Sequence, residues 1–108
     1  MSIHDYIRNE IESNDVVLFM KGSASQPACG FSSAVVRLLN KLDVKFKDID
    51  VMTSSELREG VKTFANWPTI PQLYIKGQFI GGCDIVRQMY ADGELLQLFR
   101  ANGIEFSE

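Results

Sequence analysis

Apolar residues recur along the first half of the chain with two spacings, one typical of helices and one typical of buried strands. Near the start, isoleucines four residues apart predict one face of a helix: Ile3, Ile7 and Ile11. The pair Asn14-Asp15 ends this helix, and an unbroken apolar run at 16–20 predicts a buried strand. After Cys29 the helical spacing returns and predicts a core-facing stripe at Phe31, Ala34, Val35, Leu38, Leu39 and Leu42.

The middle of the chain predicts another strand followed by a helix. Residues 46–51 alternate loosely between polar and apolar and predict the strand. Thr53-Ser54-Ser55-Glu56 fits a capping box that opens the helix. Its inner face is expected at Leu57, Val61 and Phe64. The helix should end at Asn66-Trp67-Pro68, because a residue that precedes proline avoids the helical region.

A hairpin and two helices complete the pattern. The dipeptide Lys76-Gly77 predicts a tight turn between strands at 72–75 and 78–80. Asp84 is a good N-cap for a short helix, and a last helix is expected over 94–102. The first two strands are joined through a helix and should be parallel, with a right-handed crossover, whereas the hairpin strands are antiparallel. The sequence therefore predicts an α/β fold, a four-stranded mixed sheet with helices on both faces.

Composition and charge narrow the range of functions. A chain of 108 residues favours a single domain spanning 1–108, and its formal net charge of −3 gives no basic excess for nucleic acid or a membrane surface. The first residues, MSIHDYIRNEIE, lack the features of a secretory signal or a transit peptide, so a cytoplasmic location is expected. Thiols stay reduced there. Cys29 and Cys83 are therefore expected to be reactive thiols or buried core residues, and a structural disulfide between them is a less favoured interpretation.

Cys29 is the main candidate for chemistry. It lies between a strand and the first turn of a helix, where unpaired N–H groups and the helix dipole favour a negative charge. Lys21 adds a positive charge nearby, so the thiol should ionise more easily than a free cysteine. The alternative is a buried cysteine that acts as a small hydrophobe. The loop residues on either side, Pro27-Ala28 and Gly30, favour a reactive thiol.

Four motifs in order resemble one family. Cys29-Gly30-Phe31-Ser32 is the CGFS signature of monothiol glutaredoxins. The other motifs at the family's sites are Lys21-Gly22, Trp67-Pro68-Thr69-Ile70-Pro71 and Gly81-Gly82-Cys83-Asp84. The resemblance spans nearly the whole chain and implies the thioredoxin-like (glutaredoxin) fold, which the predicted element order matches.

The resemblance also implies a glutathione site. Lys21 and Arg58 would bind its glycine carboxylate, and the backbone of Ile70 would pair with the peptide after a cis bond to its proline. The backbone of Cys83 and Asp84 would bind the γ-glutamyl end at a helix N-terminus.

Simpler roles stay open for several of these residues. Arg58 on an exposed helix face can be merely solvated, Asp84 an ordinary N-cap and Pro71 a loop stop. The Cys83 side chain either packs in the core or bridges to Cys29.

Ser32 limits the redox chemistry of Cys29. A Cys-x-x-Cys pair can close an internal disulfide, but a serine cannot. Ser32 can donate a hydrogen bond to the thiolate or serve simply as a first-turn helix residue, and both roles can hold. The chain therefore lacks a local resolving thiol, and efficient dithiol reduction is not expected.

Three functions follow from these residues. The resemblance implies a carrier of a [2Fe–2S] cluster ligated by Cys29 and glutathione from each of two chains, since such a cluster needs four sulfurs. It also implies a cluster-bound homodimer, a BolA-like partner, iron–sulfur acceptor proteins and a longer loop at 22–28. The alternative is a glutathione-dependent thiol–disulfide oxidoreductase that uses one cysteine. A thioredoxin-like interaction module without a cofactor is the third, disfavoured by the separate glutathione-site motifs.

Overall fold

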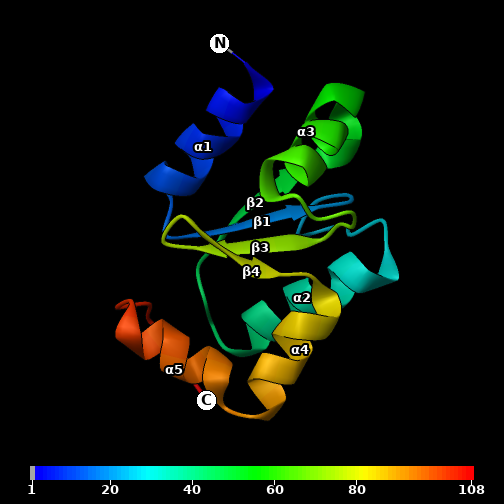
Figure 1. The fold of residues 1–108 in the computed structure, drawn as a ribbon. Coiled ribbons are helices and arrows are strands. Elements are labelled where there is room, and N and C mark those ends of the chain that lie inside the picture. The colour runs from blue at the N-terminus through cyan, green and yellow to red at the C-terminus, as the bar shows by residue number, and fades with distance from the viewer. Residues whose placement is uncertain (1) are drawn as a thin grey trace.

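In the computed structural model, which describes residues 2–108, the helices and strands follow one another in the predicted order (Figure 1). The α-helices are α1 (Ile3–Ser13), α2 (Gly30–Lys41), α3 (Ser55–Ala65), α4 (Cys83–Ala91) and α5 (Glu94–Ala101), with a short 3₁₀ helix η1 (Val51–Thr53) before α3. The strands are β1 (Val16–Met20), β2 (Lys47–Asp50), β3 (Gln72–Ile75) and β4 (Gln78–Gly81). None of the described helices is both long and apolar enough to cross a membrane.

The four strands form one mixed sheet in the order β2-β1-β3-β4. Strands β1 and β2 are parallel, whereas β3 is antiparallel to both β1 and β4, which confirms the predicted arrangement. Met20 and Asp50 are register partners at the carboxyl ends of the parallel pair. The segments that follow these two residues therefore start side by side, at the same end of the sheet.

Helices cover both faces of the sheet, with α1 and α3 on one side and α2, α4 and α5 on the other (Figure 1). Alternate residues of β1 point to opposite faces, as the pleat of a strand requires. Leu18 and Met20 join the cluster with α2, α4 and α5, whereas Val17 and Phe19 join the cluster with α1 and α3. Since both faces are buried, the strand is apolar without interruption.

The predicted inner stripe of α2 is wrong at one position. Phe31 is 62% exposed, while Ser32 is fully buried together with Val35 and Leu39. The other predicted positions do face the core, since Val35, Leu39 and Leu42 are buried and Ala34 and Leu38 pack against the core cluster. Ser32 takes the inward place that was expected for Phe31. Phe31 lies in the first turn, before the helix is fully covered.

Two predicted helix starts are also shifted. The capping box on Thr53 does not form, because Thr53 ends η1 and Ser54 becomes the N-cap of α3, where its hydroxyl accepts from the Leu57 N–H at 3.2 Å. Asp84 lies in the first turn of α4, and the N-cap is Gly82. The observed strand β2 is shorter than the predicted 46–51, since the backbone turns into η1 at Val51.

Candidate functional site

A loop closed on itself places Cys29 at the start of α2. Residues 22–28 leave β1 and return to it, because the Ala28 N–H donates to the Lys21 carbonyl at 2.9 Å and Gly22 forms a β-bridge with Pro27. Cys29 is the N-cap of α2, and its side chain is partly exposed. The loop therefore brings the thiol back beside Lys21, as the sequence predicts.

The surroundings of Cys29 stabilise its thiolate. The Ser32 backbone N–H is the largest influence that lowers the pKa of the thiol, with smaller contributions from the Phe31 N–H, the Lys21 ammonium and the Ser32 hydroxyl. Partial burial acts in the opposite direction and raises the pKa. The net pKa is below the usual value for cysteine, which confirms the prediction of an activated thiol.

Ser32 links the thiol to the end of β1. Its side chain is fully buried, and its hydroxyl oxygen accepts from the Lys21 N–H at 3.1 Å. The same side chain also lowers the pKa of the Cys29 thiol, as the smallest of the contributions. Both interpretations of Ser32 therefore hold, since it is a helix residue of the first turn and also a partner of the thiolate.

Cys29 opens on a cavity of about 520 Å³ that is rich in cations. The predicted residues Lys21, Arg58 and Ile70 line this cavity together with Cys29. Lys62 lines it as well and is not among the residues predicted from the sequence. A signal was present, because Lys62 stands four residues after Arg58 and so on the same face of α3.

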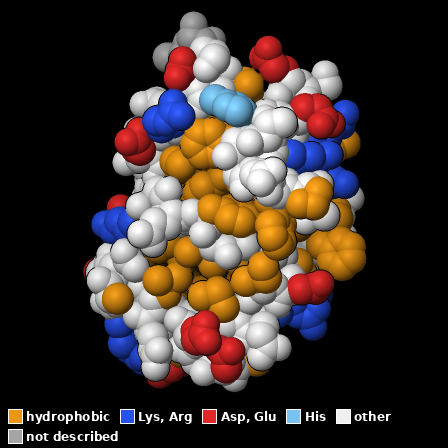
Figure 2. Space-filling view, in the orientation of Figure 1, with side chains coloured by type: hydrophobic (Ala, Val, Ile, Leu, Met, Phe, Trp, Pro, Cys, Tyr) orange, Lys and Arg blue, Asp and Glu red, His pale blue; other side chains and the backbone are white. Residues whose placement is uncertain are grey.

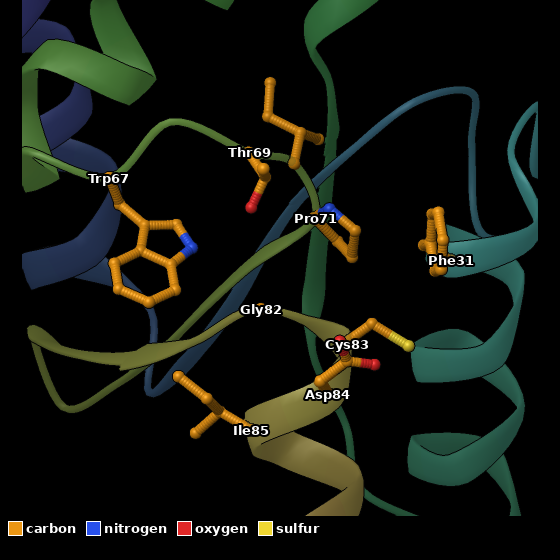
Figure 3. Close-up of a pocket in the computed structure, with 9 residues that line it drawn as sticks. Phe31, Trp67, Thr69, Pro71, Gly82, Cys83, Asp84 and Ile85 are labelled. Carbon is orange, nitrogen blue, oxygen red and sulfur yellow. The ribbon is translucent and has the colours of Figure 1, made fainter.

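A second cavity of about 170 Å³ adjoins the first and holds the other predicted residues. Cys83 and Asp84 line it, and it shares Phe31, Thr69 and Ile70 with the larger cavity. In Figure 3 the sulfur of Cys83 points toward α2, while the start of α4 faces the cavity. The two cavities together form one candidate site along the start of α2, the loop before β3 and the start of α4.

Hydrogen bonds from a buried side chain hold the loop before β3, and this side chain was not among the predicted site residues. Gln72 is fully buried, and its side-chain amide donates to the carbonyls of Trp67 and Thr69 at 3.2 and 3.1 Å. The Ile70–Pro71 peptide bond is cis, as the resemblance implied. Gln72 therefore fixes the segment that places Ile70 between the two cavities.

The two cysteines are unlike each other. Both thiols are free, so the structure contains no bridge between Cys29 and Cys83. The Cys83 side chain is 6% exposed and packs in the core cluster with α2 and α4. The structure therefore supports a Cys83 side chain that packs in the core, and not one that bridges to Cys29. His4 lies apart from the site, at 2.8 Å from the Thr63 hydroxyl.

Exposed apolar side chains surround the site. Among the residues that the structure describes, the large hydrophobic side chains with high exposure are Phe31, Met52 and Ile85, and each lines one or both cavities. Figure 2 shows apolar side chains gathered across the middle of one face, with charged side chains around them. The site thus combines a reactive thiol, cations for carboxylates and helix N-termini, a combination suited to a small anionic peptide thiol.

Comparison with known proteins agrees with this geometry. The glutaredoxin family model matches residues 16–80 of the chain. A probable monothiol glutaredoxin 2 from Rickettsia conorii is 57% identical over 96 residues, which are 89% of this chain and 90% of that protein.

Solved structures of glutaredoxins share the fold of this chain. The solution structure of a monomeric truncated mutant of Trypanosoma brucei 1-C-Grx1 superposes with a TM-score of 0.89 at 39% identity, and covers 100% of this chain and 97% of that one. A buckwheat glutaredoxin–glutathione complex superposes with a TM-score of 0.83 at 25% identity, and covers 95% of this chain and 92% of that one.

Proposed function

Because the chain belongs to the glutaredoxin family and, within it, to the monothiol glutaredoxins, we propose that it binds glutathione and carries a [2Fe–2S] cluster between two copies of itself. The observation that carries the proposal is one activated thiol beside carboxylate-binding cavities, with a serine where a resolving cysteine would stand. Cys29 is that thiol, and Ser32 is that serine. The single domain 1–108 would act in the reducing cytoplasm, where Cys29 stays a free thiol.

The charges along the two cavities support glutathione as their ligand. Its glycine carboxylate would meet Lys21, Arg58 and Lys62 in the larger cavity, and its cysteine backbone would pair with Ile70. Its γ-glutamyl carboxylate would meet the N-terminus of α4, where the backbone N–H groups of Cys83 and Asp84 lie. The buckwheat glutaredoxin of the same fold forms a complex with glutathione, which supports this assignment.

The cluster is the cargo of this proposal, and the number of sulfur ligands decides how it is held. A [2Fe–2S] cluster with thiolate ligands needs four sulfurs. Cys29 offers one, the Cys83 thiol is buried, and no group of three or more His, Cys, Asp or Glu side chains converges within residues 2–108. Two copies of Cys29 and two glutathione sulfurs supply the four ligands. The cluster-bound protein would then be a homodimer, and a BolA-like protein could replace one copy before transfer to iron–sulfur acceptor proteins.

A second function rests on the lowered pKa of Cys29. As a glutathione-dependent oxidoreductase, the thiolate would attack the glutathione sulfur of a protein–glutathione disulfide and release the protein thiol. A second glutathione would then attack the Cys29–glutathione disulfide, releasing oxidised glutathione and restoring the thiol. Both functions use the same glutathione site. They differ in whether a cluster forms on Cys29 and glutathione, and this is the property to be tested.

Reconstitution with two different thiols tests the cluster proposal. With ferric iron, sulfide and glutathione, the protein should give visible absorbance and a native mass of a dimer with about two glutathiones. With mercaptoethanol, which has no carboxylates, the cluster should not be stable. Cys29→Ser should abolish it. A stable cluster at full occupancy with mercaptoethanol, or on a monomer, would contradict the proposal.

A matched lysine pair tests the role of the carboxylate site. Lys21→Ala should need about tenfold more glutathione for half-maximal assembly, equivalent to ~1.4 kcal/mol of binding free energy. Lys45→Ala removes the same charge from an exposed position at the other end of the sheet and should assemble like the wild type. Equal glutathione requirements for the two variants would contradict the placement of glutathione beside Lys21.

A further inference from the structure

One carboxylate oxygen of Asp50 joins two segments that diverge after the parallel strands end. Its Oδ1 accepts from the Gly22 N–H at 3.0 Å and from the Met52 N–H at 2.8 Å. Gly22 opens the loop after β1, and Met52 lies in η1 after β2. Charged acceptors make stronger hydrogen bonds than neutral ones, so this oxygen is a firm link between the two segments.

Each linked segment lies next to a cation of the larger cavity. Lys21 precedes Gly22 in the chain, and the Met52 sulfur lies 3.9 Å from Nη1 of Arg58. Lys21, Met52 and Arg58 all line the cavity onto which Cys29 opens. The distance between the Lys21 wall and the Met52–Arg58 wall therefore depends on Asp50, although Asp50 itself does not line the cavity.

Asp48 provides a natural comparison. It stands two residues before Asp50 on β2, and so on the same face of the sheet. Its Oδ2 accepts from the Ala24 N–H at 2.8 Å, which holds the loop but not η1. Asp48 thus holds the loop alone, at a residue that does not line the cavity, whereas Asp50 ties the loop to η1.

We propose that Asp50 is the positioning residue of this site: it sets the spacing of Lys21 and Arg58 by linking the Gly22 and Met52 backbones. The inference rests on the proposed function, since glutathione is the ligand whose carboxylate needs the two cations at one spacing. Nothing in the local sequence indicates this role, because an aspartate before a turn is usually explained as a cap alone. Asp50 does cap η1, and the link to Gly22 comes in addition.

Calorimetric titration with S-methylglutathione, which binds without forming a disulfide or a cluster, tests the proposal. Asp50→Ala should raise the dissociation constant about tenfold, since both cations lose their common support. Asp50→Asn keeps an oxygen acceptor and should recover most of the affinity. Asp48→Ala should have a smaller effect, and Glu12→Ala, which removes an exposed charge on α1, should have none.

A double-mutant cycle separates positioning from a general loss of structure. If Asp50 acts through Arg58, the effects of Asp50→Ala and Arg58→Ala should be less than additive, while those of Asp48→Ala and Arg58→Ala should add. Full additivity in the Asp50 cycle, or unchanged affinity in Asp50→Ala and Asp50→Asn, overturns the inference. If the wild type itself does not bind S-methylglutathione, the proposed function fails, and the inference fails with it.

Discussion

At the scale of the residue, the lowered pKa of Cys29 comes mainly from backbone N–H groups at the start of α2. The Ser32 N–H is the largest influence on the pKa, and Lys21 adds a smaller electrostatic one. Ser32 matters twice, because its hydroxyl also accepts from the Lys21 N–H. The residue that replaces a resolving cysteine therefore supports the thiolate that remains.

Ser32→Ala should raise the pKa of the Cys29 thiol, because the variant loses the hydroxyl at the sulfur and the tie to Lys21. Since alkylation requires the thiolate, the pH at which alkylation of Cys29 reaches half its maximal rate should move upward. Ser33→Ala makes the same change one position along and should leave the profile in place. An unchanged profile in Ser32→Ala would show that the Ser32 hydroxyl does not contribute to the lowered pKa.

At the scale of the element, the loop at 22–28 depends on a glycine at its first position. Gly22 has φ +84°, and a Cβ there would lie 2.5 Å from the Gln26 carbonyl oxygen and 2.6 Å from the Ala28 nitrogen. These are backbone atoms, so they cannot move aside as a side chain can. Gly22 therefore permits the loop to fold back and bring Cys29 beside Lys21.

Gly22→Ala should destabilise the protein more than Gly93→Ala. Gly93 has a similar φ of +85°, but a Cβ there would meet no atom within 4 Å. The shared left-handed conformation should cost each variant about 1 kcal/mol, and the backbone collision should add roughly 1–2 kcal/mol at Gly22 alone. Urea unfolding measures both values. Equal losses would indicate that the loop can open to accept a side chain without consequence.

At the scale of the whole molecule, one sheet is shared by two hydrophobic clusters. Neighbouring residues of β1 such as Leu18 and Phe19 belong to different clusters, so the strand contributes to both at once. Helix α5 packs through Phe99 into the cluster on the α2 and α4 face. This shared strand predicts that residues 1–108 unfold as one cooperative domain.

Phe99→Ala should test this cooperativity, because Phe99 is fully buried on the last helix. The variant should lose about 3–5 kcal/mol of unfolding free energy. Circular dichroism, which follows the helices, and fluorescence of Trp67, which lines the smaller cavity, should shift to the same lower urea midpoint. Phe31→Ala, at a position that is 62% exposed, should change stability by less than about 0.5 kcal/mol. Separate midpoints in Phe99→Ala would mean that α5 unfolds on its own.

The local pattern of the sequence was sufficient to predict the order of the helices and strands and the place of Cys29 at the start of a helix. The apolar run of β1 and the Lys76-Gly77 turn lie where they were predicted, because strand period and turn chemistry act over a few residues. Local pattern was not sufficient for the faces and starts of the helices. Phe31 and Thr53 were misplaced because a shift of one residue leaves the same pattern but changes which side chain meets the sheet or caps the helix.

The order of elements, the activated Cys29 at a helix start and the missing second thiol at Ser32 all followed from residues close together in the chain. Gln72 and Asp50 became meaningful only in the folded molecule, whereas the spacing of Lys62 from Arg58 was already visible in the sequence. Lys62 lines the cation-rich cavity, Gln72 holds the loop before β3, and Asp50 links Gly22 to Met52 across 30 positions of sequence. Such links depend on distances between separate segments, and these distances are set by how the segments pack on the shared sheet, not by the residues beside them in the chain.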